Sequence, residues 1–270
     1  MYQFTDDQLD TMPLAEGGAR LNALIDPSQP FEAVMNALDD LAEDAEQHCM
    51  VLPDERDRFD CLVRLFYGEW GFCGDHESFY HSDNLFLSKV LEARSGSPVT
   101  LGAIFLYIAE DMELPVKAVN FPTQFLLRVD WRDSREPSYF DPFEGVFVTQ
   151  HLMQAWLIGQ EGPVAEIKEK DLKATEHSTI IGRWLGVAKG ALIREENYPL
   201  ALRCSDLALH FSPEDPHEHR DRGYIYQQLE VSHLAAQDYQ YFIDQCPEDP
   251  AANVLKLQVM VLNETPAVLH

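Results

Sequence analysis

The sequence predicts an α+β protein that is mainly helical. Three observations support this: a segment from Val99 to Met112 that is apolar almost all round, strand-length apolar runs directly after it, and a five-residue string that recurs later in the chain. A helix that is apolar on every side must be buried at the centre of a domain. Short runs separated by turn residues predict an antiparallel sheet beside it. We therefore expect a helix-and-sheet core followed by helical repeats.

Helices are expected on the N-terminal side of the buried helix. Between residues 31 and 49 the apolar positions recur at three and four residues, and acidic residues fill the gaps. This spacing is typical of an amphipathic helix. A second helix is expected over 53–67, since proline is favoured in a first helical turn. A short helix over 85–91 leads to Gly96 and Pro98, which mark the turn that opens the buried helix.

The strands follow Pro115, where the apolar runs shorten to strand length. Pro122 and the stretch 132–137 separate these runs, as turns between strands would. Helix is expected to return from Thr149. The predicted strands cover residues 116–121, 124–131 and 138–141.

The repeat is the strongest internal signal. The string SPEDP at 212–216 returns as CPEDP at 246–250, and this offset of 34 residues is the period of tetratricopeptide repeats. Gly223 falls where the first helix of such a repeat needs a small residue. Tyr226 and Tyr239 are the candidate contacts for a partner. The sequence predicts an acidic helical segment over 1–50 packing on the core, a core domain over 51–170, and two repeat hairpins with a C-terminal helix over 177–262.

Several motifs carry a resemblance to a known family. They are LEARSGSPVTLGAIFLYIAEDMELPV at 91–116, NFPTQFLLRVD at 120–130 and YFDPFEG at 139–145. With the repeats behind them, they resemble the bacterial SirB family, whose core is similar to the transglutaminase-like superfamily. The resemblance implies a papain-like core with a Cys at the start of a buried helix, a His on one strand and an Asp on the next. At these positions the sequence has Thr100, Gln124 and Asp141.

The resemblance therefore implies a degenerate triad. A thiolate nucleophile needs a cysteine, and there is none between Cys73 and Cys204. An amide such as Gln124 does not titrate and cannot accept a proton from a nucleophile. Thr100 can instead serve as a helix cap or packing residue, and Asp141 can bond to nearby backbone or to Gln124. The alternative is a hydrolase or acyltransferase of amide bonds with Ser97 or Thr100 as nucleophile and His76, His81 or His151 as base.

The net charge and the cysteine content bear on which partners the chain can bind and in which cell compartment it is expected. The formal net charge is -26, which disfavours binding to nucleic acid and to anionic membranes. No apolar run is long enough to span a bilayer, and the five cysteines include no CxxC pair. We expect a cytoplasmic protein with reduced thiols and without a metal or cofactor. His217 and His219 are expected to be solvated, because residues two apart diverge on a helix.

Three functions remain in competition at this point. The first is a non-catalytic module, with a regulatory role among its options, that binds a protein or peptide segment in the repeats and in the inactive cleft. The second is the enzyme with a substituted nucleophile. The third is a purely structural role, in which the repeats support the core domain. The sequence also predicts that Gln124 and Asp141 lie within hydrogen-bonding reach near the start of the helix at Pro98. It leaves the oligomeric state open.

Overall fold

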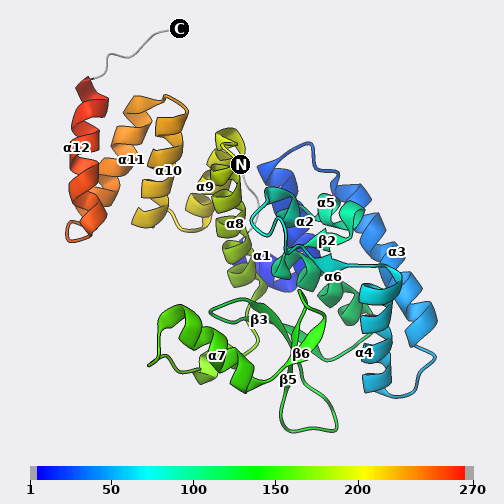
Figure 1. The fold of residues 1–270 in the computed structure, drawn as a ribbon. Coiled ribbons are helices and arrows are strands. Elements are labelled where there is room, and N and C mark those ends of the chain that lie inside the picture. The colour runs from blue at the N-terminus through cyan, green and yellow to red at the C-terminus, as the bar shows by residue number, and fades with distance from the viewer. Residues whose placement is uncertain (1–4, 265–270) are drawn as a thin grey trace. The chain divides into compact units, whose positions relative to one another are not determined.

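The computed structural model describes residues 5–264. It divides into two compact units, one from Asp6 to Trp184 and one from Leu185 onward (Figure 1). The repeat segment expected from residue 177 begins with α8 (His177–Arg194), but the division falls inside this helix. The first residues of the segment predicted over 1–50 lie outside the described part.

The first unit begins with helices that surround its centre. The helix predicted over 31–49 is present with these bounds as α3, and α2 and α3 both pack against the central helix α6 (Pro98–Asp111). The helix predicted from residue 53 starts two residues later, because the Asp54 side chain caps it by accepting from the Arg56 N–H at 2.8 Å. It then continues as a π-helix over Arg64–Glu69. The elements are α1 (Asp6–Thr11), α2 (Leu14–Ile25), α3 (Phe31–Cys49) and α4 (Glu55–Val63).

The predicted buried helix is α6 (Pro98–Asp111), and ten of its fourteen residues are buried. It follows α5 (Leu87–Ala93) and the two-residue strand β2 (Ser95–Gly96), which pairs in parallel with β1 (Cys73–Gly74). α6 lies close to the sheet at Gly102, where a Cβ atom would be only 2.2 Å from the Phe125 ring. A glycine within a helix costs stability, so here it is explained by the close approach of the sheet.

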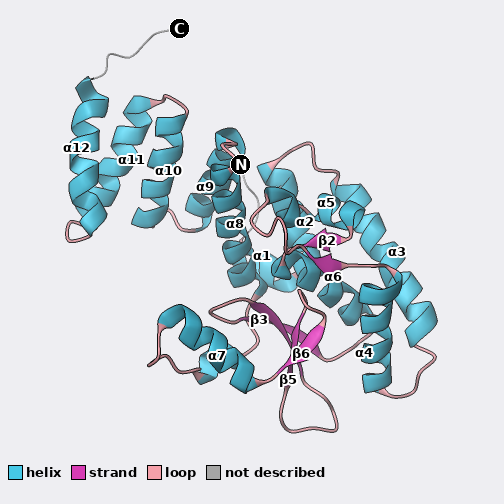
Figure 2. Cartoon of the chain, in the orientation of Figure 1, coloured by secondary structure: helices cyan, strands magenta, loops and turns pink. Residues whose placement is uncertain are grey.

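The sheet is antiparallel with the strand order β3-β4-β5-β6. Its first three strands were predicted to within two residues, whereas β6 was not, because it is short and two of its three residues are exposed. α6 packs against β3 and β4, and α7 follows the sheet (Figure 2). The bounds are β3 (Val116–Asn120), β4 (Phe125–Val129), β5 (Ser138–Asp141), β6 (Val146–Val148) and α7 (Gln150–Glu161).

An aromatic cluster joins α6 to the elements around it. The Phe105 ring of α6 lies 5.5 Å from that of Phe59, 5.4 Å from Phe66 and 5.3 Å from Phe140, measured between ring centroids. All four side chains are almost completely buried. Aromatic pairs at this separation add to the stabilisation that burial itself provides. The cluster therefore fixes α4, the π-helix and β5 around α6.

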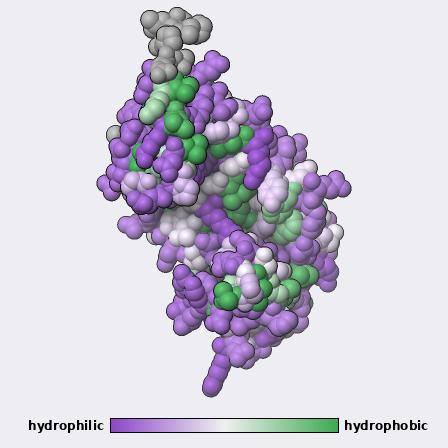
Figure 3. All heavy atoms as spheres, turned by 60° about the vertical axis from the view of Figure 1, so that its left-hand side comes forward, coloured by the Kyte–Doolittle hydropathy of each residue, from purple (hydrophilic) through white to green (hydrophobic). Residues whose placement is uncertain are grey.

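The second unit is built from stacked helices, with α10 against α9 and α11, and α11 against α12. The recurrent strings lie at the turns before α10 and α12, each of which begins at the last proline of its string. α12 leaves Val254, Leu257 and Met260 exposed, and Figure 3 shows apolar surface beside the grey C-terminal residues. The bounds are α9 (Tyr198–Phe211), α10 (Pro216–Gln228), α11 (Ser232–Gln245) and α12 (Pro250–Glu264).

Two further features concern the surroundings of the chain. All five cysteines are free, and only Cys73 is exposed. Among residues 5–264, no helix combines the length and the apolar character that crossing a bilayer requires.

We predict that Gly223→Leu destabilises the second unit. A Cβ atom at Gly223 would lie 2.7 Å from the Tyr239 ring and 3.3 Å from the Ala235 carbonyl oxygen, so the two helices would have to separate. Overpacking of this kind typically costs about 1–3 kcal/mol and is expected to lower the melting temperature. Gly186→Ala on α8 is the control: a Cβ there meets nothing within 4 Å, and alanine should raise stability slightly. Equal melting temperatures for the two variants would contradict this packing.

Candidate functional site

The start of α6 is closed by its own side chains. Ser97 caps the helix, and its backbone N–H donates to Thr100 Oγ1 at 3.0 Å. The Thr100 hydroxyl donates to the Asn84 carbonyl oxygen at 2.8 Å, and its side chain is completely buried. The Ser97 hydroxyl lies 3.0 Å from the same oxygen of Thr100. Both hydroxyls therefore satisfy backbone groups that burial would otherwise leave unpaired.

Gln124 and Asp141 form the predicted pair. The Gln124 amide donates to Asp141 Oδ2 at 2.9 Å, so the predicted contact is confirmed. Asp141 ends β5, whereas Gln124 immediately precedes β4 rather than lying within it. Asp141 Oδ1 accepts from the backbone N–H of Phe143 at 2.9 Å. Burial raises the pKa of the Asp141 carboxyl, and the backbone and Gln124 hydrogen bonds oppose this shift.

Tyr67 is a member of this site that the sequence analysis missed. Its hydroxyl donates to the Pro142 carbonyl oxygen at 2.8 Å, directly after Asp141. Burial raises the pKa of Tyr67 well above its ordinary value, and the Asp141 charge adds to the effect. Tyr67 therefore stays neutral and serves as a donor. Its place in an aromatic helical stripe gave no sign of this contact, because the partner lies 75 residues away.

The three positions implied by the family resemblance do not form one hydrogen-bonded group. Within the described residues, Thr100 bonds to Ser97 and Asn84 and to neither Gln124 nor Asp141. The histidines considered as bases are engaged elsewhere or lie on the surface. His76 Nε2 is 3.5 Å from Glu144 Oε1, His81 Nδ1 accepts from the Asp83 N–H, and His151 is exposed in the first turn of α7.

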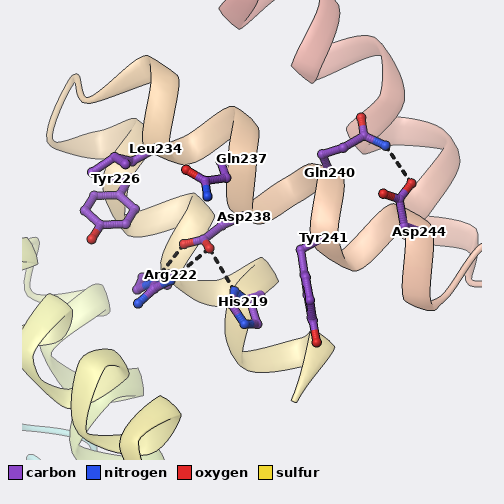
Figure 4. Close-up of a pocket in the computed structure, with 9 residues that line it drawn as sticks. All are labelled: His219, Arg222, Tyr226, Leu234, Gln237, Asp238, Gln240, Tyr241 and Asp244. Atoms are coloured by element: carbon purple, nitrogen blue, oxygen red, sulfur yellow. Dashed lines mark hydrogen bonds and ion pairs between the residues drawn. The ribbon is translucent and has the colours of Figure 1, made fainter. Parts of the chain in front are cut away.

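A second candidate site is a hollow of about 530 Å³ on the face of α10 and α11 (Figure 4). Tyr226 and Leu234 lie at one end and Tyr241 towards the other, with Arg222 and Asp238 between them. We call it the repeat hollow. The nine lining residues are His219, Arg222, Tyr226, Leu234, Gln237, Asp238, Gln240, Tyr241 and Asp244.

The floor of the repeat hollow is a buried ion-pair network. Asp238 is only 5% exposed and accepts from Arg222 Nε at 2.7 Å and from Arg222 Nη2 at 2.9 Å. His219 Nδ1 lies 2.8 Å from the same carboxylate, and Arg222 also donates to Asp206 on α9. These hydrogen bonds, chiefly those to Asp238, raise the pKa of Arg222 above its ordinary value. Because each buried charge has a partner, the floor is held in one arrangement.

At the hollow, the structure differs from the sequence-based expectations for His219 and Tyr239. His219 was expected to be solvated, but its side chain is only 15% exposed and packs against the Tyr241 ring in a tilted arrangement, with 4.0 Å between ring centroids. His217 is exposed, as expected. Of the two candidate tyrosines, Tyr226 lines the hollow. Tyr239 does not line it: its side chain is 2% exposed, and its hydroxyl donates to Gln227 Oε1 at 2.9 Å.

No group of three or more His, Cys, Asp or Glu side chains within the described part of the chain could hold a metal ion. The possible metal ligands of the repeat hollow already have other partners, because Asp238 is paired with Arg222 and His219 and Asp244 accepts from the Gln240 amide. The chemistry of the hollow is therefore that of amides, aromatic rings and a compensated charge pair.

Comparison with known proteins identifies both parts of the chain. The profile of the transglutaminase-like superfamily matches residues 32–186, and a tetratricopeptide repeat profile matches residues 188–260. The chain is 48% identical over 271 residues to a UPF0162 protein of Vibrio cholerae. It is 38% identical over 270 residues to protein SirB1 of Salmonella typhimurium and 37% identical to the UPF0162 protein YchA of Escherichia coli. Each of these alignments covers 100% of both proteins. No solved structure matches the chain.

The matched ranges agree with the helix-and-sheet core and with the stacked helices described above. High identity over the full length places the whole chain, rather than one part of it, with these relatives. The chain therefore belongs to the SirB1 (UPF0162) family, in which a transglutaminase-like domain is followed by tetratricopeptide repeats.

Proposed function

We propose that the chain is a non-catalytic binding protein, and that the repeat hollow holds an extended segment of a partner protein. One observation carries this proposal. The charged groups in the floor of the hollow are paired with one another, whereas the side-chain amides above them still offer hydrogen-bond donors and acceptors. Tetratricopeptide repeats are associated with protein interaction, and this supports the same reading. The role in the cell would be regulatory rather than chemical.

The size and the polar groups of the hollow suit a peptide. A volume of about 530 Å³ lies within the range of sites that enclose a small ligand or several residues. The Gln237 amide is exposed and makes no hydrogen bond within residues 5–264, so its donor and acceptor are both available. Gln240 uses its amide nitrogen on Asp244 and leaves its carbonyl oxygen to a ligand. Backbone N–H and C=O groups of an extended segment complement this set.

The charges of the hollow favour a neutral or basic segment. Arg222 is compensated by Asp238 and Asp206, and Asp244 adds a further negative charge at the rim. A phosphate or another anion would find no uncompensated cation here. This supports a protein partner over a nucleic acid.

The proposal that the chain is not a catalyst is argued from residues of the core domain. The resemblance implies a Cys, a His and an Asp, and the chain has Thr100, Gln124 and Asp141 there. Glutamine cannot act as a base. The Ser97 and Thr100 hydroxyls bond to each other and to backbone, so within the described residues neither donates to an imidazole that could activate it. Nothing therefore favours the enzyme with a substituted nucleophile.

We also propose a cytoplasmic location. Five free cysteines, one of them exposed at Cys73, fit a compartment that keeps thiols reduced.

A comparison of two glutamine variants tests whether peptides bind in the repeat hollow. Linear peptides selected from a displayed random library on the full-length chain should bind about thirtyfold more weakly to Gln237→Leu, which removes a donor and an acceptor worth about 1 kcal/mol each. Gln228→Leu makes the same change at an exposed position of α10 outside the hollow, and it should leave the affinity unchanged. Calorimetric titration measures both. Equal affinities for the two variants, or no peptide enrichment at all, would contradict the proposal.

The second prediction tests the degenerate triad. The double variant Thr100→Cys with Gln124→His should have no amidase activity, because the introduced thiol would lie in the closed start of α6 facing Asn84. It should also melt at a lower temperature than wild type, since lost hydrogen bonds to buried backbone cost about 1–3 kcal/mol. Thr100→Ser keeps the hydroxyl and should melt closer to wild type. Amide hydrolysis by the double variant, lost when the introduced thiol is alkylated, would contradict the view that position 100 serves only to hold the start of α6.

A further inference from the structure

An exposed aromatic cluster lies on the first unit, apart from the repeat hollow. The rings of Tyr80 and Phe79 are 5.0 Å apart, Phe79 is 5.5 Å from Phe143, and Phe143 is 4.7 Å from His76, all measured between centroids. Phe79 is 41% exposed and Tyr80 is 64% exposed. We call these four residues the aromatic patch. Rings in such a continuous exposed row are uncommon on a surface that has no partner.

The loop that carries the aromatic patch is held rigidly. Asp75 Oδ1 accepts from the backbone N–H groups of Glu77 at 3.1 Å and Ser78 at 2.8 Å, while Asp75 Oδ2 accepts from the Asn84 amide at 3.0 Å. The Asn84 amide also donates to the Ser78 carbonyl oxygen at 2.8 Å. The Asp75 N–H donates to Gly96, next to the start of α6. A polar network thus fixes a loop that keeps two large rings in water, and this preorganisation favours binding.

Phe143 connects the aromatic patch to the degenerate site. Its backbone N–H donates to Asp141 at 2.9 Å, and a Cβ atom at Gly74 would lie 2.6 Å from its ring. The ring is therefore fixed between the loop and the end of β5. The aromatic patch forms an extension of the Gln124 and Asp141 region at the protein surface.

The two segments that supply the aromatic patch, residues 65–88 and 136–167, carry acidic side chains and no Lys or Arg, and Lys89, just outside them, lines the surface next to Ser78. Glu77 is exposed, and the Glu144 side chain is 50% exposed. Histidine is the only basic residue of the patch: His76 Nε2 lies 3.5 Å from Glu144 Oε1. The patch therefore offers π-faces and carboxylates without a lysine or arginine from its own segments.

We propose that the aromatic patch binds an arginine side chain in an exposed segment of a partner protein. A planar guanidinium stacks on aromatic faces and at the same time donates in its plane to carboxylates such as Glu77 and Glu144. A lysine ammonium stacks less well, and an apolar side chain would leave both carboxylates unused. This site lies on a different unit from the repeat hollow and does not depend on it.

The test uses the full-length chain and three short acid-free peptides that differ at two positions only. One carries two arginines, one two lysines and one two citrullines, the neutral analogue of arginine. We expect the arginine peptide to bind most tightly and the citrulline peptide at least about tenfold more weakly, as loss of a cation over aromatic rings implies. Phe79→Ser with Tyr80→Ser should weaken binding of the arginine peptide by a similar factor. Affinities are measured by calorimetry, and circular dichroism checks that each variant is folded.

A matched pair of charge variants separates a specific site from general attraction to an acidic protein. The double variant Glu77→Gln with Glu144→Gln removes two negative charges from the segments that form the patch. The double variant Glu32→Gln with Asp40→Gln removes two from exposed positions of α3, outside those segments. The first pair should weaken arginine-peptide binding about tenfold and the second by less than twofold. Equal effects of the two pairs, equal binding of the citrulline peptide, or no binding of the arginine peptide would overturn the proposal.

Discussion

The burial of α6 over most of its length is the constraint on which the core domain depends. Because the start of the helix lies inside the protein, the polar groups there must find partners within it. Ser97, Thr100 and the Asn84 carbonyl oxygen supply those partners, and Gly102 lets the sheet approach closely enough to cover the helix. The consequence is chemical as well as structural. The hydroxyls at the position where the family resemblance implies a nucleophile are already engaged in holding the helix.

A similar rule shapes the second unit. Asp238 is buried between α10 and α11, where an unpaired carboxylate would be strongly destabilising, and Arg222 and His219 compensate it. These paired groups form the floor of the repeat hollow. Only the side chains that the floor does not use remain available to bind a partner. Gln237 keeps its amide unpaired within the described residues, and the aromatic patch of the first unit keeps its rings in water. In both units the groups proposed for function are those that the fold does not use for its own stability.

Much of the fold could be predicted because its signals are local. The all-round apolar pattern located α6, turn residues separated three strands, and the offset between the recurrent strings set the register of α10 and α12. The contact of Gln124 with Asp141 also followed from the family resemblance. What could not be predicted depends on distant partners. No local sequence pattern distinguishes Tyr226, which lines the hollow, from Tyr239, which lies in the core. Nor does any local pattern show that His219 contacts Asp238. The brief strands β1, β2 and β6 likewise carry too few residues to form a pattern.

If the chain binds a peptide segment without altering it, a bound peptide should stay chemically intact. A peptide selected on the full-length chain would be incubated with a stoichiometric amount of that chain and an added primary amine, and then followed by mass spectrometry over many hours. We expect the peptide to be recovered with its mass unchanged. Recovery of cleaved, deamidated or amine-linked peptide, at a rate that falls when Thr100, Gln124 or Asp141 is substituted, would contradict it.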